Sequence, residues 1–137
     1  MSQSLLDKRV VVTGGFGALG SALGKYLLAQ GARVILLDRS EVPADLLATQ
    51  NLLCLGGVDL TSAESAAGAF EQAAAHWGGI DGLVNVAGGF SWETLEGGSL
   101  NTWDRLYQMN VRTAVVSAQS ALAYLLRSRA GRIVNIG

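Results

Sequence analysis

The sequence predicts an α/β fold, a doubly wound parallel sheet with strand order 3-2-1-4-5. Short aliphatic runs such as Val10 to Val12 lack polar alternation, which is typical of strands covered on both faces. Longer segments with helical apolar spacing separate these runs, and glycines mark the turns between them. Because strand-helix-strand crossovers are almost always right-handed, this alternation builds a parallel sheet with helices on both faces.

The predicted elements follow one another along the whole chain. The predicted strands are residues 8–13, 33–38, 52–58, 80–87 and 131–137. The predicted helices are residues 17–30, 61–77 and 101–127. In the first helix Leu19, Leu23 and Leu27 recur at helical spacing, and Gly31 follows as a stop signal. The chain ends inside the predicted fifth strand, so we expect residues 1–137 to form one incomplete domain.

Composition narrows the classes of function. The chain has 137 residues, half of them hydrophobic and 15% charged, which excludes a disordered polymer. A net charge of -1 gives no basic field, so neither nucleic acid nor an anionic membrane is an expected partner. No apolar run is long enough to span a bilayer, and the first residues do not read as a secretory signal. We therefore expect a soluble, cytoplasmic protein in which the single cysteine, Cys54, is a buried thiol.

A glycine-rich turn, Thr13-Gly-Gly-Phe-Gly-Ala-Leu-Gly20, stands where the first strand meets the first helix. Glycines allow close backbone approach, and the amides and dipole of a helix N-terminus favour a pyrophosphate. Asp38 ends the second strand at about the twenty-residue spacing at which a carboxylate reaches the ribose hydroxyls of a dinucleotide. This carboxylate would repel the 2'-phosphate of NADP and favours NAD. Arg39 could instead pair with that phosphate, which leaves NADP open.

With these features the sequence resembles the short-chain dehydrogenase/reductase family, classical type, over essentially the whole chain, as its N-terminal cofactor-binding part. Further matches are Val58-Asp-Leu60 after the third strand, Asn85-Val-Ala-Gly88 at the end of the fourth, Trp103-Asp-Arg105 with Met109-Asn-Val111, and Gly131-Arg-Ile-Val-Asn-Ile136. The resemblance implies a Rossmann-like dinucleotide-binding domain over residues 1–137. It implies that the cofactor contacts Gly14, Phe16, Gly17, Ala18, Leu19, Gly20, Asp38, Arg39, Asp59, Leu60, Asn85, Ala87 and Gly88.

The resemblance also implies an NAD(P)-dependent oxidoreductase that transfers a hydride to or from a carbonyl or alcohol. In the family a Tyr is the acid/base, a Lys four residues later lowers its pKa, and a Ser orients the substrate. Here Asn110 matches the family's supporting asparagine. The only lysines are Lys8 and Lys25, and neither lies four residues after a tyrosine. We therefore expect the chain by itself to bind cofactor without turnover.

Two other interpretations stay open. Ala18 stands where the classical turn has a glycine, so the pattern TGxxGxxG also fits the extended family members that act as nucleotide-sugar epimerases. The motifs around Asn85 and Gly131 are classical features, and they favour the classical type. The turn together with Ala87-Gly-Gly89 also looks like dihydropteridine reductase, although Asn110 fits the classical group better. A non-catalytic dinucleotide-binding module is the second alternative.

Other polar residues carry weaker signals. His76, the only histidine, is most simply a residue that complements a helix C-terminus, and no metal site is expected. Glu93, Glu96 and Trp92 follow the fourth strand, where open α/β sheets bind ligands. Trp92 is the best candidate of these to line a cleft, whereas solvated loop carboxylates are the simpler interpretation of the two glutamates.

The long helix carries the signal of a partner. Between Val111 and Leu126 its apolar positions form more than one core-facing stripe: Val111, Ala114, Val115, Val116, Ala118, Ala121, Leu122, Ala123, Tyr124 and Leu125. One face should meet the sheet and the other a second copy, as the corresponding helix does in the family. We therefore expect a homo-oligomer through the helix 101–127, which a Val116→Lys substitution should disrupt.

Overall fold

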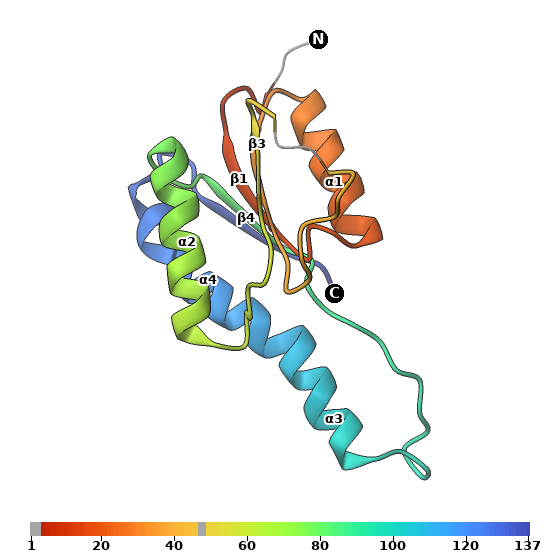
Figure 1. The fold of residues 1–137 in the computed structure, drawn as a ribbon. Helices are drawn as coiled ribbons and strands as arrows, with labels where there is room; N and C mark the ends of the chain where they lie inside the picture. The colour runs from red at the N-terminus through yellow and green to blue at the C-terminus, as the bar shows by residue number, and fades with distance from the viewer. Residues whose placement is uncertain (1–3, 47–48) are drawn as a thin grey trace.

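A parallel sheet forms the centre of the computed structural model, which describes residues 4–46 and 49–137 (Figure 1). Its strands are β1 (Arg9–Thr13), β2 (Arg33–Leu37), β3 (Leu52–Leu55), β4 (Gly82–Asn85) and β5 (Arg132–Asn135). They lie in the order β3-β2-β1-β4-β5, and every pair is parallel. The predicted fold class and strand order are confirmed.

Strand β1 lies in the middle because both neighbours pair along its length. Val10 aligns with Val34 of β2 on one side and with Gly82 of β4 on the other. Val11 and Val12 are fully buried, as a strand with helices on both faces requires. The uninterrupted apolar run of this strand therefore reflects its central place in the sheet.

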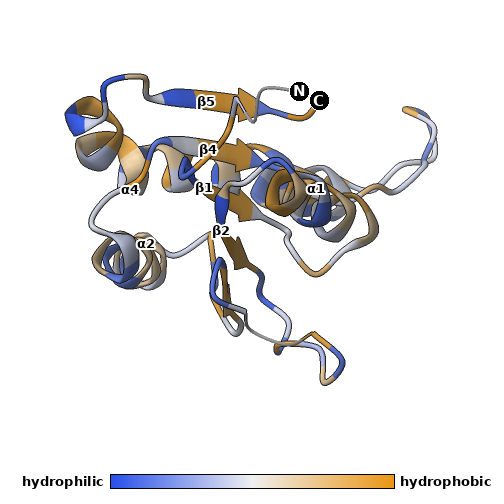
Figure 2. Cartoon of the chain, turned by 90° about the horizontal axis from the view of Figure 1, so that it is seen from above, coloured by the Kyte–Doolittle hydropathy of each residue, from blue (hydrophilic) through white to orange (hydrophobic). Residues whose placement is uncertain are grey.

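The helices divide between the two faces of the sheet. They are α1 (Ala18–Ala29), α2 (Ala63–Trp77), α3 (Leu100–Tyr107), the π-helical segment η1 (Gln108–Arg112) and α4 (Thr113–Arg127). Helices α2 and α4 pack on one face and α1 on the other (Figure 2). Phe70 of α2 is fully buried in the first of these layers, while Leu27 of α1 belongs to the second.

The predicted single helix over 101–127 needs a correction. The helical stretch begins at Leu100 and contains the π-helical turn η1 between α3 and α4. A π-turn accommodates one extra residue and changes the direction in which the following side chains point. Here the Asn110 side chain donates a hydrogen bond to the Leu106 carbonyl, inside the helix, at 2.9 Å. Helix α3, with none of its residues buried, extends from this junction beyond the sheet (Figure 1).

The later strands are shorter than predicted. Strand β3 ends at Leu55, before Gly56 and Gly57, and the last of these has φ +67°. Strands β4 and β5 keep only the central residues of the predicted segments, because pairing stops where the chain leaves the sheet. Cys54 in β3 is partly exposed, whereas full burial was expected, and the burial that remains raises the pKa of its thiol.

Among the described helices, none has the length and apolar character needed to cross a membrane.

Candidate functional site

A cleft of about 350 Å³ opens at the carboxyl ends of the parallel strands, the place where open α/β sheets bind ligands. It is lined by Gly14, Gly17, Ala18, Leu19, Gly20, Asp38, Arg39, Val58, Asp59, Leu60, Thr61, Val86, Ala87, Gly88, Met109 and Thr113. The structure thus brings together eleven of the residues that the sequence singled out for a cofactor. Phe16, Asn85 and Asn110 do not line it.

The floor of the cleft is made where the chain leaves β1 and β4. The buried Thr13 hydroxyl accepts the backbone N–H groups of Val86 and Ala87, each at 3.1 Å. Gly14 follows with φ +63°, and a Cβ there would lie 2.9 Å from the Cα of Ala87. Only glycine combines this backbone conformation with so close an approach. Thr13 and Gly14 therefore hold the two strand ends together.

Helix α1 presents an open N-terminus to the cleft. Its first turn holds no acidic residue, and Gly17 at the N-cap position provides no side-chain acceptor for the amides of this turn. Gly20 lets the turn fold back on itself, because a Cβ there would overlap the Gly14 carbonyl oxygen. Unsatisfied amides and the positive end of the helix dipole together favour an anion such as a phosphate.

Asp38 stands beside this turn with its carboxylate fixed in place. One oxygen accepts the Phe16 N–H at 3.1 Å, and the other accepts the Ser40 N–H at 3.0 Å. Each carboxylate oxygen has a second lone pair, so both can still accept from a ligand hydroxyl. Phe16 thus acts through its backbone, which orients Asp38. Arg39 is exposed and lines the same cleft.

The opposite wall comes from the loop between β3 and α2. The Asp59 carboxylate accepts from both the hydroxyl and the backbone N–H of Thr61, at 2.6 and 2.9 Å. These hydrogen bonds, with smaller contributions from the charges of Arg112 and Arg39, lower the pKa of Asp59 below its usual value. Both bonds use Oδ1, which leaves Oδ2 available to a ligand donor. Leu60 is buried and anchors this loop in the core.

Two asparagines predicted at the site have other partners. Asn85 is buried, and its amide donates to the Asn135 side chain at 2.8 Å, which joins β4 to β5. Asn110 lies in η1 and brackets Gly89, accepting from its N–H at 3.1 Å and donating to its carbonyl at 3.0 Å. Asn110 therefore ties the long helix to the loop that follows β4.

Sequence reasoning missed five of the lining residues: Val58, Thr61, Val86, Met109 and Thr113. Thr61 could have been found, because the backbone N–H two residues after an aspartate is a common partner of its carboxylate. Met109 and Thr113 lie four residues apart, and the Thr113 hydroxyl donates to the Met109 carbonyl at 2.7 Å. Their spacing places both on one face of a helix, although nothing in the sequence shows which face meets the cleft.

The weaker candidates lie outside the lining of the cleft. Glu93 accepts from the Thr102 hydroxyl and the Ser99 N–H, so it holds its loop to the start of α3. Trp92 is 77% exposed, and Glu96 is exposed as well. His76 lies in the last turn of α2 with its ring edge-on to Trp77. Within residues 4–46 and 49–137, no group of three His, Cys, Asp or Glu side chains is close enough to hold a metal ion.

The sheet order, the glycine turn and the cleft at the switch point define the class of Rossmann-like α/β domains. The family model for short chain dehydrogenases matches residues 8–137. The chain belongs to the short-chain dehydrogenase/reductase family, and it corresponds to the N-terminal part of its relatives.

Relatives of known name cover the chain almost completely. The 2-(S)-hydroxypropyl-CoM dehydrogenase 3 of Xanthobacter autotrophicus is 32% identical over 100% of this chain and 56% of its own length. A short-chain dehydrogenase/reductase from Serratia marcescens is 32% identical with a TM-score of 0.82, over 97% of this chain and 58% of that one. The ligand-free aldohexose dehydrogenase of Thermoplasma acidophilum is 28% identical with a TM-score of 0.85, over 100% and 51%. The chain thus spans little more than half the length of these relatives.

Proposed function

We propose that this chain is the cofactor-binding part of an NAD(P)-dependent oxidoreductase and that it prefers NAD(H). The observation that carries the proposal is the open N-terminus of α1, formed by Gly17 and Gly20, beside the oriented carboxylate of Asp38. The amides would hold the pyrophosphate and the carboxylate would accept the ribose hydroxyls. The names of the relatives, which are dehydrogenases, support the oxidoreductase assignment.

The preference for NAD(H) follows from the way Asp38 is held. Because two backbone amides fix both carboxylate oxygens, the group is not free to turn away from a 2'-phosphate. Two negative groups at contact distance repel each other strongly at a partly buried site. Arg39 offers a compensating charge, but its exposed side chain is screened by water and salt. The balance therefore favours the cofactor without the extra phosphate.

The rest of the cleft fits the remaining parts of a dinucleotide. Asp59 would accept from the adenine amino group through its free oxygen, Oδ2. Ala87 and Gly88 have small side chains or none, which leaves space for the cofactor along the cleft. The nicotinamide supplies hydride chemistry when bound. Asn110 would keep the loop after β4 in place beside it. None of the three tyrosines has a lysine four residues later. We therefore propose that this chain binds the cofactor but does not by itself catalyse the reaction.

Calorimetric titration with NADH and NADPH tests the proposal. We expect NADH to bind more tightly, and Asp38→Ala to narrow the gap by weakening NADH and relieving the repulsion of NADPH. Asp45→Ala, an exposed carboxylate outside the cleft, is the matched control and should leave both affinities unchanged. Arg39→Ala should weaken only NADPH.

Equal or tighter binding of NADPH by the wild-type chain would mean that Arg39 dominates and would overturn the preference. No binding of either cofactor would overturn the proposed function. The chain mixed with NADH and a panel of ketones, or with NAD+ and a panel of secondary alcohols, should show no change in NADH absorbance.

A further inference from the structure

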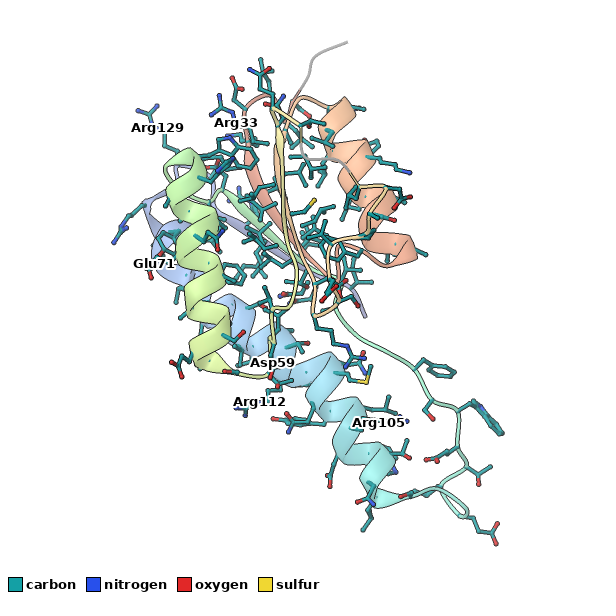
Figure 3. The ribbon with its side chains drawn as sticks, viewed as in Figure 1. Arg33, Asp59, Glu71, Arg105, Arg112 and Arg129 are labelled. Carbon is teal, nitrogen blue, oxygen red and sulfur yellow. The ribbon has the colours of Figure 1, made fainter. Side chains whose placement is uncertain are left out.

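Arg112 is a residue of the long helix that no part of the proposed function uses. It is the last residue of η1, and its Nε donates to the Thr61 carbonyl at 2.8 Å. Thr61 belongs to the loop that carries Asp59, so the hydrogen bond crosses from the helix to the far wall of the cleft. Figure 3 shows Arg112 and Asp59 close together near the foot of α2.

Three contacts hold the loop around Asp59 to the rest of the molecule. At its base Leu60 is 5% exposed and packs into the core. The bonds between Thr61 and Asp59 are internal to the loop, whereas the Asp59 N–H donates to the hydroxyl of Ser65, in the first turn of α2, at 3.0 Å. Within the described residues, the bond from Arg112 is the only hydrogen bond that joins residues 59–62 to the long helix. Leu60 thus anchors the loop in the core, Ser65 ties it to α2, and Arg112 ties it to the long helix.

We propose that Arg112 is a positioning residue that holds the Asp59 loop in register with the adenine end of the cleft. The inference rests on the proposed function, because it assigns the adenine end to that loop. It also gives the π-turn a role: η1 carries Asn110, which holds the loop after β4, and Arg112, which holds the loop after β3. One turn of helix therefore holds both the loop after β3 and the loop after β4.

The two nucleotide halves of the cofactor, tested one at a time, distinguish this role from a general attraction of Arg112 for anions. AMP carries the adenine, and nicotinamide mononucleotide carries the other base with a phosphate of its own. If Arg112 positions the adenine loop, Arg112→Ala should weaken AMP roughly two- to tenfold, the range for loss of one hydrogen bond, and leave nicotinamide mononucleotide unchanged. Arg112→Lys, which keeps the charge and can still donate a hydrogen bond, should recover part of the affinity for AMP.

Hydrogen exchange of the free chain reads the position of the loop without any ligand. In Arg112→Ala the amides of Thr61 and Ser62, both bonded to Asp59, should exchange faster, whereas those of β1 and β4 should not change. Arg105→Ala is the matched control, since Arg105 is an exposed arginine on the neighbouring α3 (Figure 3). It should leave both exchange and AMP binding as in the wild type.

The inference is overturned if Arg112→Ala matches Arg105→Ala in exchange and in AMP affinity. Equal weakening of AMP and nicotinamide mononucleotide also overturns it, because that result marks a general electrostatic effect. A wild-type chain that binds NADH but shows either pattern in the variants loses only this inference. A wild-type chain that binds no NADH loses the proposed function and the affinity claim together.

Discussion

At the scale of the residue, Gly17 and Gly20 of the same turn face different constraints. A Cβ at Gly20 would overlap the carbonyl oxygen of Gly14, a rigid backbone atom. At Gly17 the nearest atom would lie at 3.5 Å, an ordinary van der Waals contact. Substitution by alanine, which adds one methyl group, should therefore distinguish the constraints at these two glycines.

We expect Gly20→Ala to lower the free energy of unfolding by about 1–3 kcal/mol, the usual cost of an overpacked site. Gly17→Ala should cost less than about 1 kcal/mol, because alanine is only a poorer N-cap than glycine. Urea unfolding of the two variants without cofactor measures both values. Equal losses would show that the backbone of the turn moves to accept the Gly20 methyl group.

At the scale of the element, a cluster of polar side chains joins three segments at the amino ends of the strands, opposite the cleft. Arg9 at the start of β1 donates to Asp81, just before β4, through its backbone N–H and Nε, both at 2.9 Å. The hydroxyl of Ser128, after α4, donates to the same carboxylate at 2.7 Å. The side-chain hydrogen bond from Arg9, more than any other contact, lowers the pKa of Asp81 far below its ordinary value.

The depressed pKa of Asp81 predicts how stability depends on pH. A carboxylate with a lowered folded-state pKa stabilises the fold above its unfolded pKa of about 4, and this stabilisation is lost as pH falls toward the folded value. Asp81→Asn should therefore cost about 1.5–3 kcal/mol at pH 7, and the difference from the wild type should shrink between pH 4 and pH 2. Urea unfolding across this range checks it, with the exposed Asp45→Asn as the control. A difference that stays constant with pH would contradict the assignment to ionised Asp81.

The elements also show which features of the fold could be predicted from the sequence. Strand order was predictable, because right-handed crossovers leave few topologies for alternating strands and helices. The π-turn was not, since Gln108 to Arg112 contains no glycine or proline to mark it. Asn85 was assigned to the cofactor from its motif, but in a strand it shares a face with Leu83 and points away from the cleft into the buried layer. The sequence motifs predicted most of the residues that line the cleft, whereas the direction of each side chain could be seen only in the structure.

At the scale of the whole molecule, an apolar stripe remains uncovered along α3, η1 and α4. Its members are 45–76% exposed: Trp103, Tyr107, Val111, Val115, Leu122 and Leu126. The expected second apolar face of this helix therefore exists, but Val116 is not on it. Val116 is 6% exposed and belongs to the core, so a lysine there would unfold the domain instead of testing an interface.

We expect the stripe to mediate self-association, because contiguous exposed apolar patches of this kind mark interaction sites. Val115→Lys and Leu122→Lys should each weaken association by more than about tenfold, since a charge would be buried in the interface. Gln72→Lys, on the exposed side of α2, adds the same charge elsewhere and should have no effect. Sedimentation velocity over a range of concentrations measures the change. A wild-type chain that stays monomeric throughout would rule out this surface as an interface of the chain alone.

The central place of β1 has a consequence for the order in which the fold can form. Its partner on one side, β4, comes so late that the paired residues Arg9 and Asp81 are 72 positions apart. At about 5–20 residues per second, a ribosome needs roughly 4–14 seconds to make the intervening chain. During that interval β2 is the only native neighbour of β1 that has been made, and the other edge of β1 stays open to other chains. The central strand of the finished sheet is thus an edge strand until β4 has been synthesised.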